Sequence, residues 1–232
     1  MEQKTKRILV MAAMVLLTVL AFFLRQNQPA DKGGPLVWLS LAVLAACALY
    51  ALSLRPGKAW PFDSGSMIPP LVSMAAAGLM LGGALLRFSA GGKLLMVALP
   101  ALTALCWAVI GLKNRSGQPS PWLYMLPVLF FGAELVAEFR IWGSDPQILD
   151  YCYALLALIA TMCAVFHMGG FCFGKGKRRL TVFFVMSGIF FNGAALADAA
   201  EEQLCIKLAA LLWLGVSLWQ LLQPRDRKNS DA

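Results

Sequence analysis

The chain has 232 residues, of which 59% are hydrophobic and only 14% are charged. Soluble domains carry about 25% charged residues, so this composition excludes a water-soluble globule and favours a protein that has lipid as its solvent. The formal net charge of +8 does not indicate a nucleic-acid partner, because the charges form short clusters between apolar runs and accompany no nucleic-acid-binding motif.

Eight apolar runs have the length of a membrane-spanning helix, which needs about 20 residues. A backbone in hydrocarbon must satisfy its own hydrogen bonds, and no alternating segments of the barrel type are present, so the expected fold is all-α. We predict a polytopic transmembrane helix bundle in one integral membrane domain, residues 1–232, with spans at about 8–24, 35–54, 68–86, 94–112, 122–139, 146–173, 180–197 and 205–222.

Local signals refine several of these spans. The first follows a basic segment, as a signal peptide does, but no A-x-A site comes after it and Arg25 flanks it, so we expect a retained helix. Ser120-Pro121 and Asp145-Pro146 each place a capping residue before a proline, which is typical of a helix start. Ser144 with Gln147 also fits a capping box.

The distribution of Lys and Arg predicts the orientation. With the N-terminus inside, fourteen of the twenty lie on the cytoplasmic side: Lys4, Lys6, Arg7, Arg55, Lys58, Lys113, Arg115, Lys175, Lys177, Arg178, Arg179, Arg225, Arg227 and Lys228. Six lie outside: Arg25, Lys32, Arg87, Lys93, Arg140 and Lys207. This asymmetry follows the positive-inside rule, so both termini are expected in the cytoplasm. A seven-span alternative without the fifth span would place Lys175–Arg179 outside.

Two glutamates in the fifth span are the sharpest functional signal. Glu134 and Glu138 are four residues apart and share one helix face. Counted from Trp122, they lie ~18 Å and ~24 Å along the span. A carboxylate at such depth should face protein or water. One interpretation is a cation or proton site that opens outward; the other is a structural ion pair with Arg87, Lys93 or Arg140.

Acidic residues gather around the predicted outer end of the glutamate span, namely Asp145, Asp150, Asp198, Glu201 and Glu202. Such a rim can concentrate cations electrostatically. It can equally reflect the shortage of positive charge that the topology requires on this side.

Two polar residues in later spans, His167 and Asn192, give weaker indications of function. His167, the single histidine, can act as a proton relay or pack at a helix interface. Asn192 can contribute to the cation site or hydrogen-bond across helices.

Gly78-x-x-x-Gly82 and Gly170-x-x-x-Gly174 predict close helix contacts, within the chain or in a dimer.

The basic loop before the seventh span is expected to touch the inner leaflet. Lys175, Lys177, Arg178 and Arg179 can contact anionic lipid headgroups there. The positive-inside rule alone also accounts for this cluster.

Catalytic, metal and cofactor signatures are missing from the sequence. The six cysteines form no CxxC pair, one histidine cannot build a zinc site, and no nucleotide-binding fingerprint is present. We therefore expect no metal and no cofactor, and the sequence favours a non-enzymatic role without deciding it. Cys152 and Cys205 both map near the outer face, where a disulfide between them is conceivable.

The stretch 142–179 carries the most distinctive residues: Trp142, Asp145-Pro146, Leu149-Asp150-Tyr151-Cys152, His167, Gly169-Gly170-Phe171 and Lys177-Arg178-Arg179. From Pro121 onward the chain resembles uncharacterised multi-pass membrane proteins of Gram-positive anaerobic bacteria. The resemblance implies a bacterial cell-membrane location and carries no activity.

These observations favour a small transporter-like or channel-like protein in which Glu134, Glu138 and Asn192 bind a cation or proton. A second hypothesis is a non-catalytic subunit that docks a partner membrane protein or a second copy of itself. A third is a lipid-binding or lipid-modifying protein that uses His167 and the basic loop.

Overall fold

The computed structural model describes residues 2–28, 34–57, 62, 66–117, 120–142 and 148–223. The predicted helix start at Asp145-Pro146 and the capping box of Ser144 with Gln147 lie outside these residues. The same holds for Lys32, Lys58, Arg225, Arg227, Lys228 and the side chain of Asp150.

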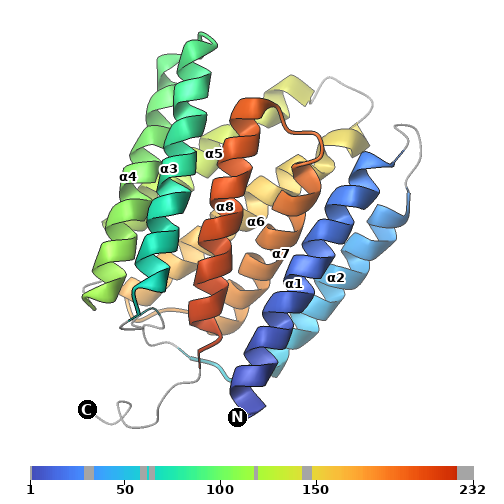
Figure 1. Ribbon diagram of the computed structural model, residues 1–232, viewed down its shortest axis with the longest axis vertical. Coiled ribbons are helices and arrows are strands. Elements are labelled where there is room, and N and C mark those ends of the chain that lie inside the picture. Colours follow the sequence, from blue (N-terminus) through green and yellow to red (C-terminus); the bar gives the residue numbers. More distant parts are fainter. Residues whose placement is uncertain are drawn as a thin grey trace.

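Within the described residues the chain forms eight α-helices and no strand, which confirms the predicted all-α bundle (Figure 1). The helices are α1 (Glu2–Gln26), α2 (Pro35–Ser53), α3 (Ile68–Ser89), α4 (Leu94–Arg115), α5 (Trp122–Trp142), α6 (Ile148–Cys172), α7 (Arg178–Ala195) and α8 (Glu201–Leu221). Seven of these, all except α7, are long and apolar enough to cross a membrane. The chain is therefore a multi-pass membrane protein whose outer helix faces contact lipid.

Helix α7 differs from the others because it lies at the centre of the bundle. It has 18 residues, begins with Arg178 and Arg179, and contains Asn192, so it is less apolar than its neighbours. Helices α1, α2, α6 and α8 pack against it, and every residue from Val185 to Ala195 is buried. Since protein rather than lipid surrounds α7, polar groups on it find partners inside the bundle.

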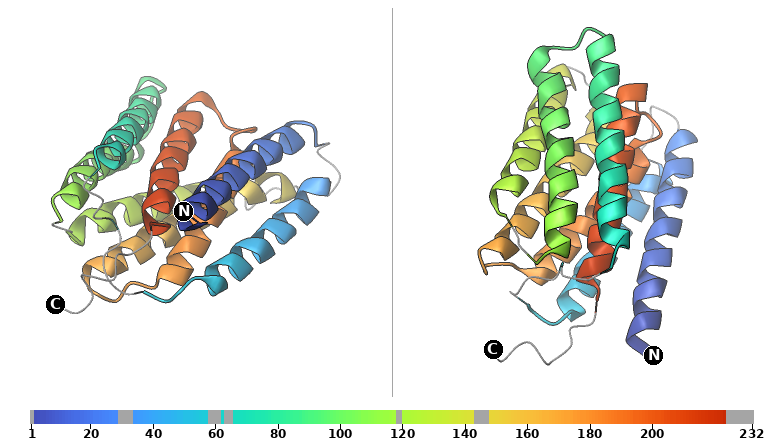
Figure 2. Two further views of the ribbon diagram at one scale, coloured as in Figure 1. Left: turned by 60° about the horizontal axis from the view of Figure 1, so that its bottom comes forward. Right: turned by 60° about the vertical axis from the view of Figure 1, so that its left-hand side comes forward.

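Six of the helices close a ring. Helix α3 packs on α4, α4 on α5, α5 on α6, α6 on α7, α7 on α8, and α8 returns to α3. Figure 1 shows this ring from the side, and Figure 2 shows it from two further directions. Helices α1 and α2 lie outside the ring and pack against α7.

The bundle has two ends that are used below as landmarks (Figure 1). The terminal end is the one where α1 begins and α8 ends. The distal end is the opposite one, where α3 is followed by α4 and α7 by α8. Because α1 begins and α8 finishes at the same end, the described helices cross the bundle an even number of times.

Two glycines allow helices to approach closely. A Cβ atom on Gly193 of α7 would lie 2.1 Å from Cγ2 of Thr18 on α1. A Cβ atom on Gly83 of α3 would lie 2.8 Å from Cγ1 of Ile206 and 3.0 Å from the carbonyl oxygen of Glu202, both on α8. The second contact brings the start of α8 beside the end of α3, where the polar residues of the distal end meet.

The two glycine motifs found in the sequence have other positions. Cβ atoms on Gly78 and Gly82 would meet nothing within 4 Å, so this motif faces away from the rest of the chain. Gly174 has a φ of +66° and follows the end of α6. Its N–H bonds the carbonyl of Phe171, and the N–H of Lys175 bonds the carbonyl of Gly170, which is the Schellman pattern of a helix terminus.

Candidate functional site

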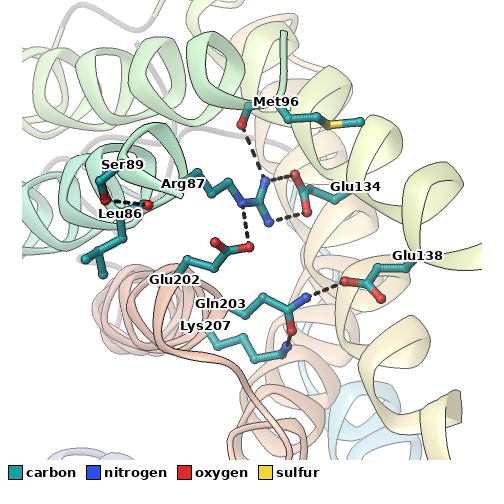
Figure 3. Close-up of polar contacts among 9 residues, drawn as sticks. All are labelled: Leu86, Arg87, Ser89, Met96, Glu134, Glu138, Glu202, Gln203 and Lys207. Atoms are coloured by element: carbon teal, nitrogen blue, oxygen red, sulfur yellow. Dashed lines mark hydrogen bonds and ion pairs between the residues drawn. The ribbon is translucent and has the colours of Figure 1, made fainter. Parts of the chain in front are cut away.

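A small cavity lined by both polar and apolar side chains lies inside the six-helix ring toward its distal end. The centre of a water molecule can occupy about 20 Å³ inside this cavity. About 10–15 Å³ of such space is enough to hold one water. Five helices line it: α3 with Arg87, α5 with Phe131, Glu134 and Glu138, α6 with Ala154, Ala157 and Leu158, α7 with Asn192, and α8 with Gln203, Ile206 and Lys207. Figure 3 shows its charged side chains.

Arg87 and Glu134 form a buried bidentate ion pair at one wall of the cavity (Figure 3). The Nη1 atom of Arg87 contacts Oε1 of Glu134, and Nη2 donates to Oε2 at 2.9 Å. Only 8% of Arg87 and 6% of Glu134 are exposed. This fork geometry neutralises both charges and occupies both carboxylate oxygens of Glu134.

The remaining donors of Arg87 connect two further helices. Its Nη1 also donates to the carbonyl oxygen of Met96 in the first turn of α4 at 3.4 Å, and Nε lies 3.5 Å from Oε1 of Glu202 at the start of α8. One guanidinium therefore ties α3 to α4, α5 and α8. The close approach at Gly83 brings Glu202 within its reach.

Glu138 has a different environment from Glu134. The Nε2 atom of Gln203 donates to Oε1 of Glu138 at 2.7 Å, and the ammonium of Lys207 donates to Oε1 of Gln203 at 3.2 Å. Gln203 and Lys207 lie four residues apart, on one face of α8. The amide of Gln203 thus bridges a carboxylate of α5 and an ammonium of α8 (Figure 3).

Asn192 lines the α7 side of the cavity. Its Nδ2 atom donates to Oγ1 of Thr161 on α6 at 2.8 Å and to the carbonyl oxygen of Gly188 at 2.8 Å. Both amide hydrogens are therefore used. The side-chain group of Asn192 that can still bind a ligand is therefore its carbonyl oxygen, which suits positive charge.

Aromatic side chains fill the ring beyond the cavity, in the direction of the terminal end. Trp107 of α4 stacks on Trp213 of α8, with Phe131 6.2 Å from the Trp107 ring centroid and Tyr124 6.5 Å from that of Trp213. All four side chains are buried. Trp213 lies six residues after Lys207, ~9 Å deeper along α8. These rings form a floor beneath the polar groups.

The other candidates for pairing with the glutamates lie elsewhere. Lys93, which precedes α4, and Arg140, in the last turn of α5, are exposed. At the rim, Nε of Arg25 lies 2.5 Å from Oδ2 of Asp198, so part of the acidic rim is already neutralised. Glu201 is exposed at the start of α8.

His167 is not part of the cavity. It lies near the terminal end of α6, where its ring stacks on Phe184 of α7 at a centroid distance of 5.3 Å. The neighbouring Phe166 makes an edge contact with it at 5.6 Å. These ring contacts account for the position of His167 as a helix-packing residue.

The basic loop divides into two kinds of residue. Arg178 donates to the carbonyl oxygen of Leu221 from Nε at 3.0 Å and from Nη2 at 2.5 Å, and Nε of Arg179 donates to the carbonyl oxygen of Leu54 at 2.8 Å. These two arginines cap the C-terminal ends of α8 and α2, where carbonyls lack helical partners. Lys175 and Lys177 are exposed.

Among the described residues, no group of three or more His, Cys, Asp or Glu side chains is arranged to hold a metal ion. The thiol of Cys205 is free, so no disulfide joins it to Cys152.

Three residues at the site are not predicted from the sequence, namely Gln203, Lys207 and Thr161. A signal for Lys207 is present, because it is a charged residue two positions inside the predicted span 205–222. Gln203 lies one turn before it, on the same face. For Thr161, a small polar residue in an apolar run, no sequence signal distinguishes a partner of Asn192 from an ordinary core threonine.

In comparisons with known proteins, no family model, no curated protein and no solved structure matches this chain significantly.

Proposed function

We propose that this protein is a small transporter-like membrane protein that binds one small monovalent cation in the distal cavity, with Glu138 as the principal ligand. The observation that carries the proposal is that the two glutamates have different hydrogen-bond partners. Both glutamates line the cavity, but Arg87 occupies both oxygens of Glu134, whereas Oε1 of Glu138 accepts a hydrogen bond from the neutral amide of Gln203.

The neutral oxygens around Glu138 support a cation rather than an anion as the ligand. Asn192 lines the cavity, and its amide hydrogens bond Thr161 and Gly188, so the side-chain group that it can still offer to a ligand is the carbonyl oxygen. A carboxylate with neutral carbonyl oxygens is a ligand set that suits hard cations.

Size and charge favour a monovalent ion. A volume of about 20 Å³ accommodates an ion with little of its hydration shell and excludes organic cations. Mg²⁺ usually keeps several waters, and Ca²⁺ takes six or more oxygen ligands. Within the part of the chain that the structure describes, no cluster of three acidic, His or Cys side chains is present to meet that demand.

The aromatic floor favours a transporter over an open channel. Trp107, Trp213 and Phe131 fill the ring beneath the polar groups. Movement of a cation past this floor requires the helices to rearrange, as in alternating access.

We place the protein in a bacterial cell membrane with its terminal end in the cytoplasm. The excess of Lys and Arg at that end supports this orientation, and the resemblance noted above supports the location. In this arrangement the cavity lies toward the external side, and Lys175 and Lys177 lie toward the anionic headgroups of the inner leaflet.

Flux measurements in proteoliposomes test the proposal. Uptake of Na⁺, K⁺ and Li⁺ is compared for the wild type, Glu138→Gln and the control Glu201→Gln, which removes an exposed carboxylate at the same end. We expect Glu138→Gln to lower uptake about tenfold or more, equivalent to about 1.4 kcal/mol of lost stabilisation, and Glu201→Gln to retain it. Equal uptake by Glu138→Gln and the wild type, or wild-type uptake no faster than that of empty liposomes, would contradict the proposal.

A further inference from the structure

Arg7 of α1 lies over the indole ring of Trp219 of α8, with its guanidinium carbon 3.1 Å from the ring centroid. Helix α1 packs on α2 and α7, and α8 packs on α3 and α7, so this stack joins two helices that share α7 as a neighbour. Both side chains are half-buried, and the indole ring attracts the positive charge above its face. The face of the guanidinium is therefore in contact with the ring, while its N–H groups are left for other partners.

The N–H groups of Arg7 have no acceptor within the part of the chain that the structure describes. Its Nε atom is buried there without a hydrogen-bond partner. The donors of a guanidinium lie in its plane, so stacking on Trp219 directs them sideways, in the fork geometry that matches two oxygens of a phosphate. Because a buried charged donor without an acceptor is unfavourable, this arrangement favours an acceptor from outside the chain.

The arginines at the start of α7 differ from Arg7 because their donors are already used. Arg178 and Arg179 bond main-chain carbonyls at the ends of α8 and α2. These two side chains hold helix ends together, whereas Arg7 keeps its donors for another group. Lys4 lies one turn before Arg7, on the same side of α1, and is exposed, so it adds a second positive charge near the stack.

No carboxylate balances these charges at the terminal end among the side chains that the structure describes. The described carboxylates all lie in the distal half of the bundle (Figure 1), namely Glu134, Glu138, Asp198, Glu201 and Glu202. An anion beside Arg7 therefore meets a positive potential without repulsion from a described acidic side chain.

The depth of the stack indicates the source of the anion. The apolar run of α1 begins at Ile8, directly after Arg7, and Trp219 lies two residues before Leu221, the last residue of α8. Tryptophan and arginine side chains at the ends of spanning helices lie at the level of the lipid headgroups. Ile8 is exposed and continues the surface as apolar, which suits the acyl chains of a lipid and offers nothing to a free phosphate ion.

We propose that Arg7, stacked on Trp219 and assisted by Lys4, binds the headgroup phosphate of one anionic phospholipid in the leaflet at the terminal end. The guanidinium donates to two phosphate oxygens, and the acyl chains lie along the apolar surface of α1. The lipid thereby adds a second link between α1 and α8. A zwitterionic lipid carries its own cation beside the phosphate, so it binds more weakly at a site of positive potential. The distal cavity takes no part, so this inference does not depend on the proposed cation site.

Native mass spectrometry of the full chain in detergent tests this lipid site. Delipidated protein is titrated with phosphatidylglycerol, phosphatidylcholine and inorganic phosphate in separate series, and the number of bound molecules is counted at each concentration. We expect the wild type to bind one phosphatidylglycerol molecule in preference to all others, with phosphatidylcholine and inorganic phosphate each about tenfold weaker or more.

Four variants show which group holds the lipid. Arg7→Gln should weaken phosphatidylglycerol binding about tenfold, because both charge and fork are lost. Arg7→Lys keeps the charge without the fork, and Trp219→Leu keeps the charge without the stack, so each should bind with intermediate affinity. Arg115→Gln is the matched control, since it removes an exposed positive charge at the same end of the bundle, and it should bind like the wild type.

Two results would overturn the site. Equal phosphatidylglycerol affinity in the wild type and Arg7→Gln is one, and an equal loss in Arg7→Gln and Arg115→Gln is the other, since binding would then reflect net charge alone. Phosphatidylcholine or inorganic phosphate bound as tightly as phosphatidylglycerol would overturn the anionic lipid as the ligand. If Arg7→Gln does not elute as a folded species, Arg7→Lys decides the question: unchanged affinity contradicts the proposal, and weaker binding supports it.

Discussion

Trp107 of α4 and Trp213 of α8 stack face to face inside the six-helix ring, with ring centroids 4.9 Å apart and planes 3° from parallel. The indole N–H of Trp107 is buried and has no hydrogen-bond acceptor among the described residues. Buried tryptophans usually find an acceptor for this group. The stack therefore combines extensive apolar contact with one unsatisfied donor.

Replacement of Trp213 by alanine should weaken both the fold and the barrier. Removal of a buried aromatic side chain costs about 3–5 kcal/mol, so we expect a clearly lower thermal midpoint in detergent. We also expect faster proton leakage through liposomes that contain the variant. Trp122→Ala is the control, since 77% of Trp122 is exposed. Equal midpoints and equal leakage for the two variants would show that the stack is neither a packing centre nor a barrier.

The Arg87–Glu134 pair predicts strong coupling between two substitutions. Arg87→Met leaves a buried carboxylate without its partner and should cost about 3–5 kcal/mol of stability. The double variant Arg87→Met/Glu134→Leu removes both charges and should regain most of this loss. Thermal or denaturant unfolding of both single variants and the double variant gives the coupling energy.

Arg140→Met is the matched control for that cycle, because Arg140 is exposed on the same helix as Glu134. Its stability should stay within about 0.5 kcal/mol of the wild type. Additive effects of the Arg87 and Glu134 substitutions would mean that the pair does not hold α3 against α5.

The helices could be predicted from sequence because each apolar run of sufficient length has one way to satisfy its backbone in lipid. Hydropathy predicts a span at 180–197, and the structure has α7 at 178–195. Its central position could not be predicted. Hydropathy measures how apolar a run is, and it does not tell whether lipid or protein covers it. The polar Asn192 and the two arginines of α7 are compatible with either until its neighbours are known.

The depth and the common face of Glu134 and Glu138 followed from helix geometry alone. The choice among Arg87, Lys93 and Arg140 as partners depended on how α3, α4 and α5 pack, and local sequence does not contain that information. The predicted span 205–222 puts Lys207 near its outer end, with the external charges. Helix α8 begins earlier, at Glu201, and its contact with α3 at Gly83 turns Lys207 into the ring.

Glycine spacing alone does not tell a helix-packing motif from a helix terminus, because the two depend on backbone conformation. Gly170-x-x-x-Gly174 has the spacing of a packing motif, but Gly174 adopts a positive φ and ends α6. The residues that follow, through Arg178, return the chain to α7 and cap α8. Only the conformation at Gly174 distinguishes a helix terminus from a helix face.

Alanine substitutions at three glycines should therefore have opposite effects. In Gly193→Ala the new methyl group would overlap Thr18, and we expect about 1–3 kcal/mol of destabilisation from overpacking between α1 and α7. Gly78→Ala and Gly82→Ala place their methyl groups in open space, where the better helix propensity should give up to about 1 kcal/mol of stabilisation.

Thermal unfolding measures these effects, and size-exclusion chromatography with light scattering shows the oligomeric state. A smaller oligomer in Gly78→Ala with Gly193→Ala unaffected would indicate that the outward face of α3 joins two copies of the chain. Unchanged stability in Gly193→Ala would mean that α1 is not held closely against α7.

The orientation of the bundle is open to direct measurement at one residue on each end. Ala90 is exposed in the turn after α3 at the distal end, and Lys175 is exposed at the terminal end. With fourteen of twenty basic residues assigned to the cytoplasm, an impermeant thiol reagent should label Ala90→Cys on intact cells and Lys175→Cys only after permeabilisation. The wild type, with its six native cysteines, gives the background. The reverse pattern would turn the cavity toward the cytoplasm and place the proposed cation site on the inner side of the membrane.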